Sequence, residues 1–218
     1  MKKSQLLASV SRVRGFKESA VGVTFRFLRD AGLATTGARG VNAPDMTTRD
    51  VAAVLIAMLT YETPGKQAAD AFRMIGPLEC RDPHPDPDGF SLEALRGLSA
   101  PFTFADALAA LIDVYAHGSD AEAYRNNATL MRDGSTHPPE CFVMVSRVPE
   151  AYAEIRMGPR RGQSASLYTF SGAPRSIGEA QALDPRLSPV CTRSAWIEEG
   201  TIKALADDFV QATVENAA

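Results

Sequence analysis

Cysteine, histidine and tryptophan are scarce in this chain, and their scarcity excludes several kinds of site. The 218 residues include three cysteines, three histidines and one tryptophan. Cys80, Cys141 and Cys191 are far apart and form no Cys-x-x-Cys pair, so the clustered ligands of a structural zinc site are missing. We expect three reduced thiols in a cytoplasmic protein, and no bound metal.

Long hydrophobic runs and familiar catalytic motifs are also missing. No apolar stretch approaches the roughly 20 residues that cross a bilayer, and Arg12 and Arg14 come too early for a signal peptide. The chain has no phosphate-binding glycine loop, no His-Glu-x-x-His and no Gly-x-Ser-x-Gly. We therefore expect no membrane contact, no cofactor and no enzyme. An unfamiliar enzyme built around Cys141, with His117 or His137 as its base, is the alternative.

What the chain does contain is enough apolar residues for a core and an uneven distribution of charge. Hydrophobic residues make up 45% of the sequence, which argues against a disordered protein. Residues 1–40 carry eight Lys or Arg and two acids, whereas the rest of the chain is acidic and the net charge is −3. A basic segment on an acidic body is typical of an end that binds a polyanion. A solubilising arm is the alternative.

Apolar spacing predicts helices over residues 4–14, 19–31, from 47 onward, and 64–74. Gly15 and Gly32 follow the first two as helix-ending glycines. Thr47-Thr-Arg-Asp50 has the form of a capping box, with Asp where Glu or Gln is usual. In the third helix we expect one buried face, formed by Val51, Val54, Leu55, Met58 and Leu59.

The second of these helices has a basic edge. Apolar residues cover more than half of its circumference, and the remaining narrow arc holds Ser19, Gly22, Arg26 and Arg29. Gly22 costs helix stability, about 1 kcal/mol against Ala. Its missing side chain allows another backbone, of protein or of nucleic acid, to come close. A plain helical bundle with a solvated basic edge is the alternative interpretation.

Two short helices, a turn at Gly15 and a loop with Arg39 between glycines resemble a helix-turn-helix with a rudimentary wing. In such proteins the amino-terminal part of the second helix meets base edges in the major groove of DNA. We assign base contacts to the four residues of the arc, and Arg26 suits a bidentate contact with guanine. We assign phosphate contacts to Lys17 and Arg39.

Three consecutive motifs carry a family resemblance: Leu28-Arg-Asp-Ala-Gly-Leu33, Gly37-Ala-Arg-Gly40 and Met46-Thr-Thr-Arg-Asp-Val-Ala-Ala-Val-Leu-Ile-Ala57. Their order resembles small helix-turn-helix proteins of uncharacterised function from prophage-like and gene-transfer-agent-like bacterial gene clusters. The resemblance covers about residues 4–75, with Val51 where the family pattern has Ala. It implies a helix-turn-helix fold and a phage origin, and it implies no catalytic residue.

The rest of the chain predicts a different architecture. Residues 76–100 are rich in proline and acids near their start and indicate a linker with a short helix, or an acidic strap over the basic helix. Beyond them we expect helices over 103–117 and 201–214, and strands over 141–145, 152–156, 164–170 and 190–197. The class is therefore α+β, with a helical domain at 1–75 and a small antiparallel sheet with helices on one side at 101–218.

These features predict a phage-type DNA-binding protein, a transcriptional regulator that binds double-stranded DNA as a homodimer. Residues 101–218 would serve dimerisation or partner binding, and Arg160 and Arg161 at a predicted hairpin tip offer a second nucleic-acid contact or a solvated turn. The alternative is a phage-derived protein–protein interaction factor: an adaptor, a packaging component or an inhibitor of a host system. Both interpretations need Arg26 and Arg29 to project together into solvent.

Overall fold

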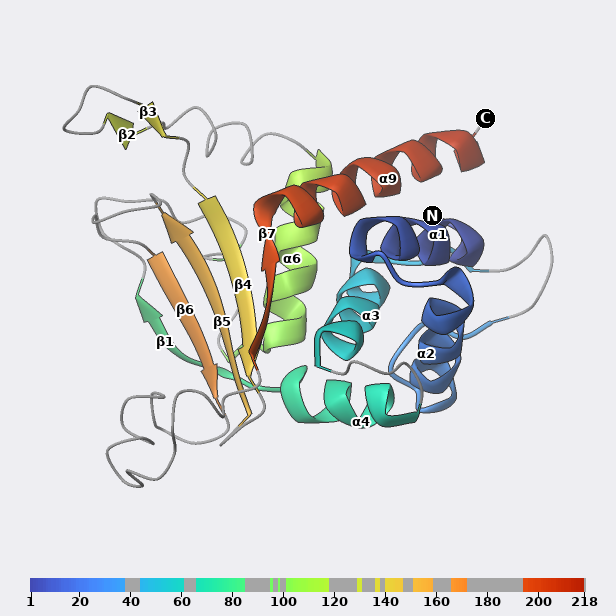
Figure 1. Ribbon diagram of the computed structural model, residues 1–218, viewed down its shortest axis with the longest axis horizontal. Helices are drawn as coiled ribbons and strands as arrows, with labels where there is room; N and C mark the ends of the chain where they lie inside the picture. Colours follow the sequence, from blue (N-terminus) through green and yellow to red (C-terminus); the bar gives the residue numbers. More distant parts are fainter. Residues whose placement is uncertain are drawn as a thin grey trace.

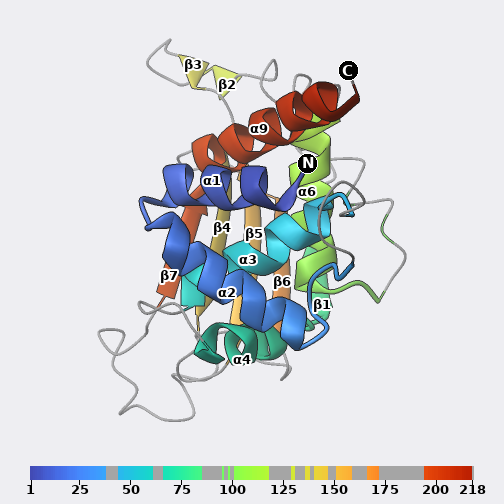
Figure 2. The same cartoon turned by 90° about the vertical axis from the view of Figure 1, so that its right-hand side faces the viewer.

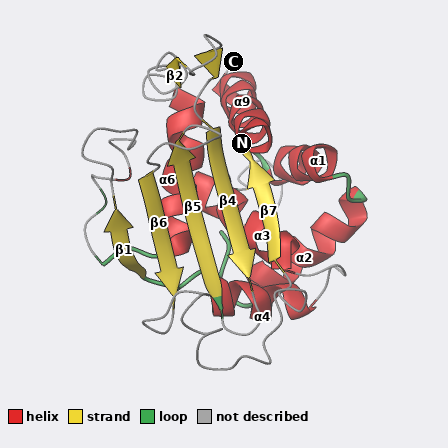
Figure 3. Cartoon of the chain, turned by 60° about the vertical axis from the view of Figure 1, so that its left-hand side comes forward, coloured by secondary structure: helices red, strands yellow, loops and turns green. Residues whose placement is uncertain are grey.

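A layer of helices packs against one face of a β-sheet in the computed structural model of the protein (Figures 1 and 3). The structure describes residues 1–37, 44–60, 66–84, 95, 98, 101–117, 129–130, 136–137, 140–146, 151–158, 166–171 and 194–217. This arrangement confirms the predicted α+β class and the predicted position of helices on one side of an antiparallel sheet.

The predicted helices are present, with bounds that differ by a few residues from those expected. They are α1 (Lys3–Arg14), α2 (Glu18–Asp30), α3 (Thr48–Thr60), α4 (Lys66–Ile75), α6 (Phe104–His117) and α9 (Glu199–Ala217). Gly15 and Gly32 adopt φ angles of 67° and 72°, the left-handed conformation that ends a helix and that glycine tolerates best. The short helix predicted within 76–100 lies almost entirely outside the described residues.

The main sheet has the strand order β1-β6-β5-β4-β7, and every neighbouring pair is antiparallel. The strands are β1 (Cys80–His84), β4 (Glu140–Ser146), β5 (Tyr152–Gly158), β6 (Ser166–Ser171) and β7 (Ser194–Glu198), with a separate pair β2 (Thr129–Leu130) and β3 (Thr136–His137). Strands β4, β5, β6 and β7 were predicted from the sequence, whereas β1 was not. Pro83 lies in β1, and a strand at the sheet edge tolerates the missing N–H of proline.

Residues alternate across the sheet, as a strand period of two requires. Val143 of β4 lies opposite Ile155 of β5 and Ile197 of β7, and all three are fully buried. Their neighbours Phe142 and Met144 in β4 are only partly buried. The buried row therefore faces the helical layer and joins its core.

Helix α3 lies in the middle of the helical layer, where it contacts α1, α2, α4 and α6 (Figure 2). The expectation of a single buried face is too narrow, because every residue from 51 to 59 is buried. The remaining buried residues are Ala52, Ala53, Ile56 and Ala57, and the three alanines allow neighbouring elements to approach closely. One continuous hydrophobic core includes both Leu6 of α1 and Leu205 of α9.

The predicted capping box at the start of α3 is confirmed. The backbone N–H of Asp50 donates to Thr47 Oγ1 (3.3 Å), and the backbone N–H of Thr47 donates to Asp50 Oδ2 (2.7 Å). Thr103 and Asp106 repeat the same arrangement at the start of α6. Each box satisfies amide groups that the first turn of a helix leaves without partners.

Helical spacing predicts an inward face of α9 with Ile202, Leu205, Phe209 and Val210, and the structure agrees except at Val210. Ile202 and Leu205 are buried, and Phe209 packs against the core from a partly buried position. Val210 was expected to lie inward as well, but it is 38% exposed. The second half of α9 lies along α1, where Ala212 is still part of the core but Val210 and Val214 face solvent (Figure 1).

Candidate nucleic-acid interface

Helix α2 lies on the outer side of the helical layer, away from the sheet (Figure 2). Helical spacing places Val21, Phe25 and Leu28 on one apolar face, and the structure buries all three against the other helices. Thr24 is also fully buried, and its Oγ1 has no hydrogen-bond partner in the described part of the chain. The face of α2 opposite these residues is the part of the helix available to a partner.

A connection of three residues joins α1 to α2. Gly15 turns the chain in the left-handed conformation, and the Ser11 hydroxyl donates to the backbone carbonyl of Phe16. Phe16 packs against the core from a partly buried position. The turn is thereby held by a hydrogen bond from α1 and by the packing of Phe16 against the core.

Gly22 lies where α2 meets α1. A Cβ atom at this position would lie 3.6 Å from Leu7 Cδ1, an ordinary van der Waals distance. The group that approaches Gly22 is therefore a side chain of the protein's own α1. Its location differs from the open ridge expected from the sequence, because the narrow polar arc is partly covered by the neighbouring helix.

Arg26 is an exposed cation of α2 whose guanidinium has an aromatic neighbour instead of an acidic one. Its side chain is exposed, and its guanidinium lies 5.7 Å from the centre of the Phe27 ring. Among the described residues no carboxylate pairs with it. Ser19 and Lys17, at the amino-terminal end of the helix, are exposed as well. These three residues, Lys17, Ser19 and Arg26, form what we call the α2 ridge.

Arg29, by contrast, has an acidic neighbour. Its Nε and Nη2 both donate to Oδ1 of the adjacent Asp30, at 3.2 and 2.9 Å, and its side chain is only 33% exposed. The expectation that two guanidinium groups project together into solvent therefore holds for Arg26 and fails for Arg29. The physical reason is the carboxylate at the next position, which holds the Arg29 side chain along the end of the helix.

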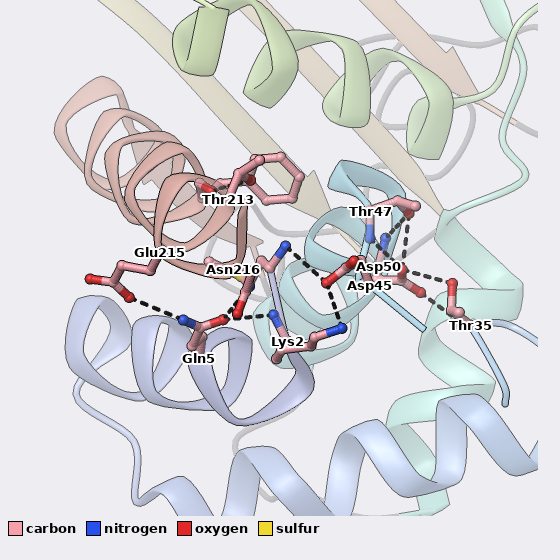
Figure 4. A network of polar contacts seen from close by, with 11 residues as sticks. Lys2, Gln5, Thr35, Asp45, Thr47, Asp50, Thr213, Glu215 and Asn216 are labelled. Atoms are coloured by element: carbon pink, nitrogen blue, oxygen red, sulfur yellow. Dashed lines mark hydrogen bonds and ion pairs between the residues drawn. The ribbon is translucent and has the colours of Figure 1, made fainter. Parts of the chain in front are cut away.

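Acidic residues from distant parts of the sequence compensate two further cations of the basic segment. Lys2 Nζ lies 3.2 Å from Asp45 Oδ1, and Arg12 Nη2 lies 2.6 Å from Asp208 Oδ2 (Figure 4 shows the first pair). The hydrogen bond from Lys2, together with its positive charge, holds the pKa of Asp45 below its ordinary value. The excess charge read from residues 1–40 is thus reduced within the folded molecule.

Two more cations of α1 are engaged with the protein itself. Lys3 Nζ lies 5.4 Å from the centre of the Phe25 ring, within the range of a cation–π interaction. Arg14 is partly buried, and its Nε has no hydrogen-bond partner among the described residues. Burial lowers the pKa of Arg14, because desolvation disfavours its charged form.

Sequence reasoning missed Asp208, the carboxylate that neutralises Arg12. Asp208 is 196 positions away along the chain, and no local motif links the two residues. The opposite net charges of residues 1–40 and 101–218 were the available signal. They were interpreted as a basic end facing an external polyanion, whereas part of that charge meets its own acidic helix.

Three predicted contact residues lie outside the described residues: Arg39, Arg160 and Arg161. The pairing expected around the last two is confirmed, because β5 and β6 are antiparallel neighbours from Tyr152–Ser171 to Met157–Ser166. Cys80 is partly exposed, Cys141 is buried, and Cys191 lies outside the described residues.

The described part of the chain contains no group of three His, Cys, Asp or Glu side chains that could hold a metal ion. Among its helices, none combines the length and the apolar character that a membrane crossing needs. No known protein family, curated protein or solved structure matches the chain. The function is therefore argued from the α2 ridge and its surroundings.

Proposed function

We propose that this protein binds duplex DNA through the α2 ridge. The observation that carries the proposal is Arg26, an exposed guanidinium on an outer helix with no carboxylate partner in the described part of the chain. The three-residue turn with Gly15 supports it, since helix-turn-helix proteins join their two helices by turns of three or four residues that often contain glycine. In those proteins the start of the second helix enters the major groove.

The dimensions of the ridge suit a single groove. Ser19 and Arg26 are seven positions apart, which is about 10 Å along a helix at 1.5 Å per residue. The major groove is about 12 Å wide and admits one α-helix. Arg26 would then read guanine, while Lys17 at the helix start would contact the phosphate backbone.

The proposal includes a regulatory role of phage type. The resemblance of residues 4–75 to helix-turn-helix proteins of prophage-like clusters supports it. In this interpretation the sheet and α9 form the body that self-associates or binds a partner. Arg39, Arg160 and Arg161 stay predictions of further phosphate contacts.

The test compares three alanine variants in titrations of selected and random-sequence duplexes, followed by fluorescence anisotropy. Arg26→Ala is expected to reduce the discrimination between sequences by about 1–3 kcal/mol. Lys17→Ala is expected to weaken all duplexes by a similar factor. Arg156→Ala is the matched control, because Arg156 is an exposed arginine of β5, on the sheet. Equal discrimination between selected and random sequences by Arg26→Ala and Arg156→Ala would refute the proposal.

A second candidate is docking onto another protein, and the charge of α2 itself favours it. Glu18 and Asp30 are exposed at the two ends of the helix, so its outer surface carries both signs. Mixed charge of this kind suits a protein surface better than a uniformly negative duplex. Co-purification with a protein after nuclease treatment, with an absorbance ratio at 260 and 280 nm typical of pure protein, would support this candidate and contradict the first.

A further inference from the structure

Helices α1 and α9 lie side by side and run in opposite directions (Figures 1 and 2). Arg12 pairs with Asp208 towards the end of α1, and near its start Gln5 bonds with Glu215 and Asn216 (Figure 4 shows the Gln5 contacts). The α1 sequence has three cations and no acid, whereas α9 has four acids and one lysine. The two helices therefore match each other in charge over their length.

The contacts between these helices are polar and open to solvent. The Arg12 side chain remains 59% exposed in its ion pair, and that of Asp208 is 27% exposed. Ile202 and Leu205 anchor the first half of α9, and in the second half Ala212 is buried whereas Val214 is 65% exposed. The acidic side chains of α9 thus reach α1 at the surface, beside this buried row.

Arg12 lies five residues before Lys17 of the α2 ridge along the chain, on the side of α1 that faces α9. Asp208 places a carboxylate on Arg12 where a phosphate of a bound duplex would supply the same negative charge. We propose that α9 is an internal anionic cover, which competes through Asp208 with DNA phosphates for Arg12. This inference rests on the proposed DNA-binding function and adds a mechanism that limits affinity.

The cover needs no unfolding of α9 in order to open. Exposed ion pairs contribute little to stability, because each partner is well solvated on its own. A duplex phosphate next to Lys17 therefore exchanges with Asp208 by a change of side-chain conformation. Each chain then gains one phosphate contact at the expense of an internal pair.

Two variants of neighbouring residues isolate this effect. Asp208→Asn removes the carboxylate that pairs with Arg12, while Asp207→Asn removes one that pairs with Lys203 within α9. Both change the net charge by the same amount on the same helix. With a random-sequence duplex of about 20 base pairs in 0.1 M salt, Asp208→Asn is expected to bind about fivefold tighter than Asp207→Asn, with a similar salt slope because Arg12 contacts a phosphate in both complexes. Equal affinities of the two variants would overturn the proposal.

Combination with Arg12→Ala separates the cover from the binding function. In that background, Asp208→Asn and Asp207→Asn are expected to give the same affinity, and a persistent difference would contradict competition for Arg12. Urea unfolding of the same four variants measures the pair without DNA. If the duplex binds and Arg26→Ala weakens it while the two Asp variants agree, the cover is wrong and the proposed function stands. If no variant binds any duplex, both the anionic cover and the proposed DNA-binding function are wrong.

Discussion

At the scale of single residues, the Asp50 carboxylate connects two segments of the chain through hydrogen bonds. It is 3% exposed and accepts four hydrogen bonds, from the backbone N–H and the hydroxyl of both Thr35 and Thr47 (Figure 4). These bonds join the segment after α2 to the start of α3. Asp50 therefore fixes the chain that follows the proposed DNA-binding helix.

Asp50→Ala is expected to lower the free energy of unfolding by about 2–4 kcal/mol, because it leaves two backbone N–H groups without acceptors near the core. Asp106→Ala removes the same residue type from the same cap position of α6, where the side chain is 33% exposed. We expect a loss of about 1 kcal/mol there. Urea unfolding of both variants provides the comparison, and equal losses would contradict the role of burial.

Asp45 provides a prediction about pH. Its folded-state pKa is lowered, chiefly by the hydrogen bond from Lys2. A lowered pKa stabilises the fold above the ordinary carboxyl range, and this contribution is lost as the pH falls through the folded-state value. NMR titration is expected to show the pKa of Asp45 rising towards its ordinary value in Lys2→Ala and staying low in Lys3→Ala. A low pKa in both variants would show that Lys2 is not the cause.

The sequence allowed the residues of the α2 ridge to be predicted but not their surroundings. Helical spacing places Arg26 opposite Val21 and Phe25, and the structure agrees. It gives no information about ion pairs, so the pairing of Arg29 with Asp30 was missed although the two are adjacent. The contact between Gly22 and Leu7 was missed because it depends on how two helices cross.

At the scale of elements, two glycines of the first helix pair have opposite roles. Gly15 has a left-handed backbone, in which a Cβ atom is strained even though the space around it is open. Gly22 has a helical backbone, and a Cβ atom would make an ordinary contact with Leu7. The same substitution is therefore expected to change stability in opposite directions.

Gly15→Ala is expected to destabilise the protein by about 1 kcal/mol, and Gly22→Ala to stabilise it by about 0.5–1 kcal/mol. Thermal unfolding of the two variants checks the signs. Gly22→Ala is also expected to leave duplex affinity unchanged, because its Cβ atom would face α1. A large loss of affinity would instead mean that DNA approaches α2 on this side, as the sequence first suggested.

Elements with a clear periodicity were predictable, and an element without one was not. Helices α1, α2 and α6 and strands β4 and β5 follow their apolar patterns closely. Strand β1 lies in a segment with proline and acids, and pairing with β6 defines it as a strand. Its local composition is that of a linker, so only the pairing with the distant strand β6 distinguishes a strand from a linker here.

At the scale of the whole molecule, the fold changes the meaning of the charge distribution. Read along the chain, residues 1–40 form a strongly basic segment. In three dimensions, Asp45 forms an ion pair with Lys2, and Asp208 forms one with Arg12 where α9 lies along α1. The sequence shows the charges but not their partners, because ion pairs between distant residues depend on the complete topology.

The salt dependence of DNA binding measures how much of this charge is left for a partner. Lys17, a released Arg29 and Arg12 freed from Asp208 offer three phosphate contacts per chain, while Arg26 contacts a base. Since each contact contributes about −0.9 to the slope of log K against log salt, we expect a slope of about −3 per bound chain. Anisotropy titrations between low and moderate salt provide the value. A slope twice as steep would mean that Arg39, Arg160 and Arg161 bind phosphate too, whereas a slope near zero would contradict DNA binding through the α2 ridge.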